Sequence, residues 1–167
     1  MNIAKAIEIA IAGTIKQYGQ IGQNTLVRPW QSLGSQYGFD TQSEDGDRYF
    51  PCVDIRCGSA ALDEDQSTWT STAPIIICTK TEDDNDHADA SRIYEAVKTV
   101  TDSLFKQFRS GVDGDELTYF KAQLTDRAGS AFHWGGLSYA EGSAPAADDS
   151  LNMIDIVLVI YHSRTDF

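Results

Sequence analysis

Positive charge, cysteine and long apolar runs are all scarce in this chain, and each scarcity narrows what the protein can be. Lys and Arg number 13 against 25 Asp and Glu, so the net charge is −12. Proteins that bind nucleic-acid phosphates or anionic membranes directly need clustered cations, so both functions are disfavoured. No window approaches the roughly 20 apolar residues of a membrane-spanning helix. Lys5, Glu8 and Lys16 interrupt the apolar residues at the start, which therefore do not resemble a secretory signal peptide.

The cysteines and histidines form no recognisable metal or catalytic pattern. The three cysteines include no C-x-x-C pair, and an odd, small number without a secretory signal predicts reduced, buried thiols in a cytoplasmic setting. Cys52 and Cys57 lie five residues apart in one expected strand, so they should point to opposite faces. The histidines share no short spacing, and no glycine pattern matches a phosphate-binding loop. We therefore expect no enzyme, no cofactor and no metal ion.

An acidic turn over residues 82–89 is the one stretch that resembles a metal site. A calcium-binding EF-hand loop needs a glycine at its sixth position. Counting from Asp84, the sixth residue is Asp89, so that glycine is missing. Helix capping explains the carboxylates without a metal, because they can accept hydrogen bonds from the free N–H groups at a helix start. A small metal-dependent hydrolase that uses Asp84, Asp86 and His87 is the least favoured alternative.

Two segments have the periodicity of amphipathic helices. In residues 2–18, isoleucine recurs every four residues, at positions 3, 7, 11 and 15. Residues 88–108 carry one apolar stripe: Ile93, Val97, Val100, Leu104 and Phe108.

Alternating or continuous apolar residues predict strands over residues 49–57, 68–81, 117–124, 130–138 and 153–161. Thr25–Val27 is a further short candidate. The first two long strands most simply form an antiparallel pair. The order α-β-β-α-β-β(-β) predicts one α+β domain over residues 1–167. In it, two main helices pack on one face of a mostly antiparallel sheet of four to five strands.

Residues 19–47 form a connection that is longer than usual. Glycine, glutamine, serine and asparagine dominate it, but aromatic residues are scattered through it. We expect an arm that packs on a neighbour, and its candidate contact residues are Trp30, Tyr37 and Phe39.

The strand over residues 153–161 is apolar on both faces, which is typical of a strand that is buried on both faces. In a small two-layer domain, helices normally cover only one face of the sheet. A neighbouring subunit and the 19–47 segment are the two candidates for the second cover. The residues that need this cover are Val157, Val159 and Tyr161.

The order of these elements resembles the tail terminator, or tail completion, proteins of long-tailed bacteriophages of the lambda type. The resemblance rests on the N-terminal helix, on a strand with an early proline at residues 49–55, and on the strand, acidic turn and long helix of residues 75–108. It also includes the apolar final strand, which ends in Tyr161-His-Ser-Arg164. It covers residues 2–164 and depends on element order and not on a diagnostic motif.

The resemblance implies a structural virion protein that forms a homo-oligomeric ring, most simply a hexamer, in the tail–neck region after assembly in the host cytoplasm. Such a ring caps the tail tube, ends tail polymerisation and offers a joining surface to the head-completion (neck) protein. DNA passes through it without specific binding. Another neck or head–tail connector protein is the alternative of the same class.

Carboxylates in the expected loops are candidates for the lumen of such a ring or for contacts between rings. A negative channel repels passing phosphates, although solvation is the plainer explanation of the same charges. The candidates are Asp63, Glu64, Asp65, Asp83, Asp84, Asp86, Asp113 and Asp115.

Overall fold

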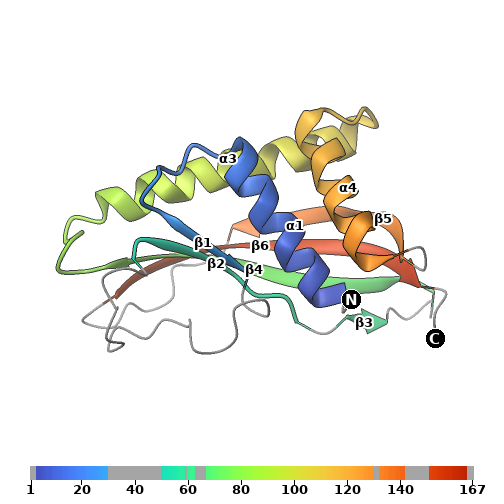
Figure 1. The fold of residues 1–167 in the computed structure, drawn as a ribbon, viewed down its shortest axis with the longest axis horizontal. Helices are drawn as coiled ribbons and strands as arrows, with labels where there is room; N and C mark the ends of the chain where they lie inside the picture. The colour runs from blue at the N-terminus through green and yellow to red at the C-terminus, as the bar shows by residue number, and fades with distance from the viewer. Residues whose placement is uncertain are drawn as a thin grey trace.

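A computed structural model of the chain describes residues 3–29, 50–58, 60–62, 67–129, 132–141 and 151–164. Within these residues, three helices lie together on one side of a six-stranded sheet (Figure 1). The elements in chain order are α1 (Ile3–Tyr18), β1 (Leu26–Pro29), β2 (Cys52–Ile55), β3 (Ala61–Leu62), β4 (Trp69–Lys80), α3 (Ala88–Ser110), α4 (Asp115–Ala128), β5 (Phe132–Glu141) and β6 (Leu151–Arg164).

The sheet is mixed but mostly antiparallel, with the strand order β1-β2-β4-β6-β5 and with β3 paired to one end of β4. Only β1 and β2 run parallel to each other. The centre of the sheet is the pair β4–β6, in register from Trp69 opposite His162 to Lys80 opposite Leu151. The predicted α+β class, the antiparallel character of the sheet and the antiparallel pairing of β2 with β4 are confirmed.

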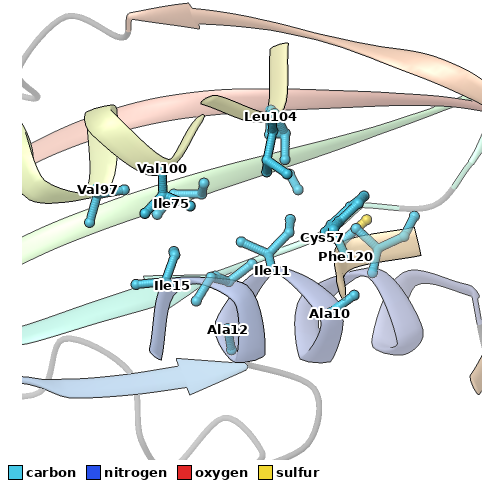
Figure 2. Packing of buried hydrophobic residues seen from close by; sticks show 14 of the residues in the cluster. Ala10, Ile11, Ala12, Ile15, Cys57, Ile75, Val97, Val100, Leu104 and Phe120 are labelled. Carbon is cyan, nitrogen blue, oxygen red and sulfur yellow. The ribbon is translucent and has the colours of Figure 1, made fainter. Parts of the chain in front are cut away.

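The core lies between the helices and the inward face of the sheet. The sheet contributes alternate, fully buried residues of its two longest strands: Ala73, Ile75, Ile77, Ile156, Leu158 and Ile160. Ile11 and Ile15 of α1 meet Val97 and Val100 of α3 in the same cluster, beside Ile75 (Figure 2). The isoleucine and valine spacing that predicted both helices therefore marks the faces that they bury.

The prediction of a strand over residues 117–124 is wrong, because this segment belongs to helix α4. Leu117, Phe120 and Leu124 are the buried residues of that helix, and their spacing of three and four residues puts them on one side. Two acidic residues occupy the first turn, and glycines flank the helix at both ends. Helix α4 packs mainly against α1, so the helix layer holds three helices where two were expected.

The other predicted elements are confirmed with shifted ends. The strand expected at 130–138 is β5 and the short candidate at Thr25–Val27 is β1. The sixth strand, β3, was not predicted. Of the expected arm over residues 19–47, the structure describes only the part up to Pro29. Its aromatic contact candidates, Trp30, Tyr37 and Phe39, lie outside the described residues.

Truncating Ile75 tests which face of the sheet carries the core. The Ile75→Ala substitution removes buried methyl groups and leaves a cavity, so we expect a loss of about 2–5 kcal/mol in the free energy of unfolding, measured by chemical denaturation. The neighbouring Ile76 points to the other face and is half-buried. Ile76→Ala is the matched control and should cost clearly less; equal losses would contradict the one-sided core.

Candidate assembly face and acidic turn

The sheet face opposite the helices, called here the second face, is apolar at its centre. It consists of the β6 residues that alternate with the buried core residues of that strand, together with the β4 residues paired opposite them. Pro74 and Ile76 of β4 and the β6 residues from Met153 to Tyr161 on this face are partly shielded from water, whereas Thr72 is exposed and Cys78 and Leu151 are buried. Its apolar members are Pro74, Ile76, Met153, Val157, Val159 and Tyr161.

The structure brings three of the predicted contact residues together on this face. Val157 and Val159 lie opposite Pro74 and Thr72 of β4 and are half-buried. Tyr161 is also half-buried, and its hydroxyl lies 3.2 Å from the Ser138 hydroxyl of β5, at hydrogen-bond distance. No helix of the described residues packs on this face, and a contiguous apolar surface of this kind is typical of an interaction site.

At the β1–β2 edge of the second face lies a buried ion pair that the sequence patterns did not predict. Arg28 of β1 lies beside Asp54 of β2, in register, and both are almost completely buried. Arg28 Nε donates to Asp54 Oδ1 at 2.6 Å and Nη2 donates to Oδ2 at 3.1 Å. Burial raises the pKa of Asp54, and the guanidinium opposes that rise. The pair fixes β1 against β2 through two parallel, charge-assisted hydrogen bonds.

The cysteines are buried and free, as predicted. Cys52 lies opposite Cys78 on the second face and accepts a contact from Arg28 Nη2 at 3.2 Å. A hydrogen bond with Cys78, together with burial, raises the pKa of the Cys52 thiol well above its usual range. Cys57 belongs to the core on the helix side, where burial and the nearby Glu8 raise its pKa to about 12. These raised pKa values keep the Cys52 and Cys57 thiols protonated and poorly nucleophilic.

Removing one partner of the buried pair should be costly. Asp54→Leu leaves the Arg28 guanidinium buried without its carboxylate, so we expect a loss of about 3–5 kcal/mol in the free energy of unfolding. The double variant Arg28→Met with Asp54→Leu removes both charges and should recover most of that loss. Chemical denaturation of the two variants checks this, and a double variant no more stable than the single one would contradict it.

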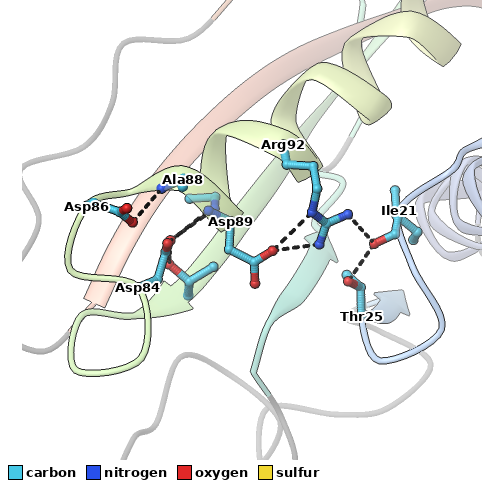
Figure 3. A network of polar contacts seen from close by, with 9 residues as sticks. Ile21, Thr25, Asp84, Asp86, Ala88, Asp89 and Arg92 are labelled. Carbon is cyan, nitrogen blue, oxygen red and sulfur yellow. Dashed lines mark hydrogen bonds and ion pairs between the residues drawn. The ribbon is translucent and has the colours of Figure 1, made fainter.

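The acidic turn between β4 and α3 is a helix cap. Asp84 is buried, and its Oδ1 accepts the N–H of Asp89 at 2.8 Å while its Oδ2 accepts that of Ala90 at 3.0 Å. Asp86 Oδ1 accepts the N–H of Ala88 at 3.2 Å. These carboxylates satisfy the free donors of the first helical turn (Figure 3). The predicted capping function of the turn is confirmed for Asp84 and Asp86.

Asp84 also ties the turn to the sheet. Thr79 Oγ1 of β4 donates to Asp84 Oδ2 at 2.8 Å, and Asn152 Nδ2 of β6 donates to the Asp84 carbonyl at 2.7 Å. Burial alone would raise the pKa of Asp84, but the hydrogen bonds from Asp89, Ala90, Thr79 and Asn152 together hold that pKa below its usual value. Both carboxylate oxygens of Asp84 are therefore engaged in the scaffold.

The start of α3 is also joined to the segment that follows α1. Arg92 donates to Asp89 Oδ1 through Nη2 at 2.6 Å and through Nε at 3.1 Å. Its Nη1 donates to the Ile21 carbonyl at 3.2 Å, which also accepts the Thr25 hydroxyl (Figure 3). The acidic turn is thus one part of a network that fixes α1, α3 and the sheet relative to one another.

Neutralising Asp84 should weaken the fold in a pH-dependent way. At pH 7, Asp84→Asn replaces a charged acceptor of several hydrogen bonds, so we expect a loss of about 1–3 kcal/mol in the free energy of unfolding. The folded-state pKa of Asp84 is depressed. The wild-type advantage is therefore fully present above the unfolded pKa and disappears as pH falls through the folded one.

Unfolding curves of wild type and variant, recorded from pH 7 down to pH 2.5, measure this difference. Asp83→Asn is the matched control, because Asp83 is exposed in the same turn. A stability difference that stays constant over this pH range would contradict the assignment of the cap to the Asp84 carboxylate.

The remaining acidic candidates occupy two separate places. Asp83 and Asp86 are exposed before the start of α3, whereas Asp113 and Asp115 are exposed beyond its end. Helix α3 has 23 residues, so about 35 Å separates the two sites. Asp113 pairs with Lys121 at 2.9 Å. The third predicted group, Asp63, Glu64 and Asp65, lies outside the described residues.

No group of three or more potential ligands from His, Cys, Asp and Glu gathers at one point within the described ranges. Among the helices of those ranges, none has both the length and the apolarity needed to cross a bilayer. The chain matches no model of a known protein family, and a comparison with curated protein sequences gives no significant match.

Proposed function

We propose that this protein is a structural component of a long-tailed bacteriophage, a tail terminator that forms a ring on the end of the tail tube. The ring ends tail polymerisation and presents a joining surface to the neck. Its partners are further copies of the same chain, the tube protein and the head-completion protein. DNA passes through the ring without specific binding, and no catalytic step belongs to this function.

The observation that supports this proposal best is the second face. Helices cover one side of the sheet, and several apolar side chains of β4 and β6 on the other side, Pro74 and Ile76 among them, are only partly buried. Val157, Val159 and Tyr161 form the continuous part of that surface. A domain that leaves its longest strands apolar on the uncovered side gains stability when another protein surface covers them.

The charge distribution also suits a ring through which DNA passes. The chain carries a net charge of −12, and Asp83, Asp86 and Asp115 are exposed in turns or at helix ends. Carboxylates on the lumen of a channel repel phosphates and prevent adhesion. Because the two exposed acidic sites lie at opposite ends of α3, one can line the lumen while the other faces a partner ring.

The hydrolase alternative has no support in the geometry of the acidic turn. Both oxygens of Asp84 already accept hydrogen bonds from the protein, and His87 is exposed in the turn itself. A different head–tail connector protein fits the same second face. The length of tails assembled without the protein distinguishes a tail terminator from another connector protein.

Electron microscopy of virions assembled without the protein tests the proposal. Loss of a terminator should give tails of uncontrolled, excessive length. Loss of another connector would instead give tails of normal length that remain unjoined to heads, and that outcome would overturn the terminator assignment.

Supplying a variant of the protein with an altered second face tests whether tail length depends on that face. Val159→Asp places a charge in the apolar surface, so we expect it to fold but to leave tails overlong. Val112→Asp is the matched control, because Val112 is 70 % exposed in the turn after α3 and its replacement should terminate tails normally. Normal termination by Val159→Asp would show that the second face is not used.

A further inference from the structure

Asp155 of β6 is a carboxylate in the middle of the apolar second face. Its register partner on β4 is Ile76, and its neighbours along β6 on the same face are Met153 and Val157. The Asp155 Oδ1 atom is buried and has no hydrogen-bond partner within the described part of the chain. A charged oxygen withdrawn from water without a partner destabilises the subunit that carries it. Its position therefore indicates a donor that arrives from outside the subunit.

A second carboxylate, Asp54, lies in register with Asp155 across the sheet, and it has the partner cation that Asp155 lacks within the described ranges. Asp54 of β2 is opposite Ile76, and Ile76 is opposite Asp155, so the two carboxylates stand on one face at two strand spacings, about 10 Å. Asp54 is neutralised within the subunit by Arg28. Asp155 has no such cation among the described residues, and it is less deeply buried than Asp54.

Three basic side chains on the helix layer, Lys16 of α1 and Lys106 and Arg109 of α3, are exposed and engage no carboxylate of the described part of the chain. Lys106 and Arg109 are neighbours in the last turns of α3, so two of these cations lie together there. The Arg109 guanidinium lies 5.7 Å from the centroid of the half-buried Phe105 ring. This end of α3 thus combines cations with an aromatic surface, which is complementary in charge and in apolarity to the surroundings of Asp155.

We propose that the second face of one copy binds the C-terminal end of α3 on another copy, with Lys106 against Asp155 and Arg109 beside it. The inference rests on the proposed ring and names the contact that builds it. The two surfaces belong to opposite layers of the subunit, so the contact is heterologous, and such contacts generate closed rings when the rotation between neighbours suits. The apolar residues around Asp155 exclude water and strengthen the ion pair.

Replacing Asp155 by an apolar residue should shift monomer stability and assembly in opposite directions. Asp155→Val removes the unpaired buried oxygen, so the thermal midpoint of the isolated monomer should rise. It also removes the partner of the cation, so the dissociation constant for self-association should increase at least tenfold, as measured by sedimentation equilibrium. Asp126→Val, at an exposed carboxylate of α4, is the matched control and should leave association unchanged. A lower midpoint, or an unchanged dissociation constant, would overturn the proposal.

Zero-length cross-linking identifies the contact directly. A carbodiimide joins a carboxylate to an adjacent lysine amine as an amide, and takes up the elements of water to become a urea. A mixture of ¹⁴N- and ¹⁵N-labelled protein, assembled on tail tubes, should give a mixed-isotope peptide that links Asp155 to Lys106. Asp155→Asn should remove this product. A link from Asp155 to another lysine or to the tube protein, or no intermolecular link, would overturn the assignment.

The outcomes separate this contact from the proposed function. Normal termination of tails without the Asp155–Lys106 link would refute the contact and leave the terminator function standing. If the Asp155–Lys106 link forms, but virions assembled without the protein have tails of normal length, the contact is supported and the terminator function is refuted.

Discussion

The antiparallel pairing of β4 with β6 is the interaction on which the rest of the structure depends. The two strands stay in register over their length, so every second residue of both points into the same core and the others point away from it. Three helices cover the inward side, and the core residues there are fully buried. The other side keeps apolar residues at partial exposure. A single pairing therefore orients both the core residues of the subunit and the apolar residues of the second face.

Polar groups in the described part of the chain chiefly stabilise the scaffold. Asp84 caps α3 and holds Thr79 and Asn152 of the two central strands, while Arg28 and Asp54 lock the edge pair β1–β2. Asp155 differs from both, because its buried oxygen has no partner among the described residues. Carboxylates that look alike in the sequence thus have three different environments.

Local patterns in the sequence predicted most of the sheet, two helices and the cap, because their evidence lies within a few residues. The stripe of α3, the carboxylates before it and the apolar run of β6 are of this kind. Helix α4 was mistaken for a strand, since the adjacent aromatics Tyr119 and Phe120 obscured the three- and four-residue spacing of Leu117, Phe120 and Leu124. The Arg28–Asp54 pair could not be foreseen, because it depends on the parallel alignment of β1 and β2 across 26 residues.

The central claim is that the second face is covered when copies of this chain assemble on the end of a tail tube. Negative-stain electron microscopy of purified protein added to polymerised tubes tests it most directly. The account predicts a ring at one end of each tube and no further growth when free tube protein is supplied. Bare tube ends that continue to elongate, with the protein still monomeric in solution, would contradict it.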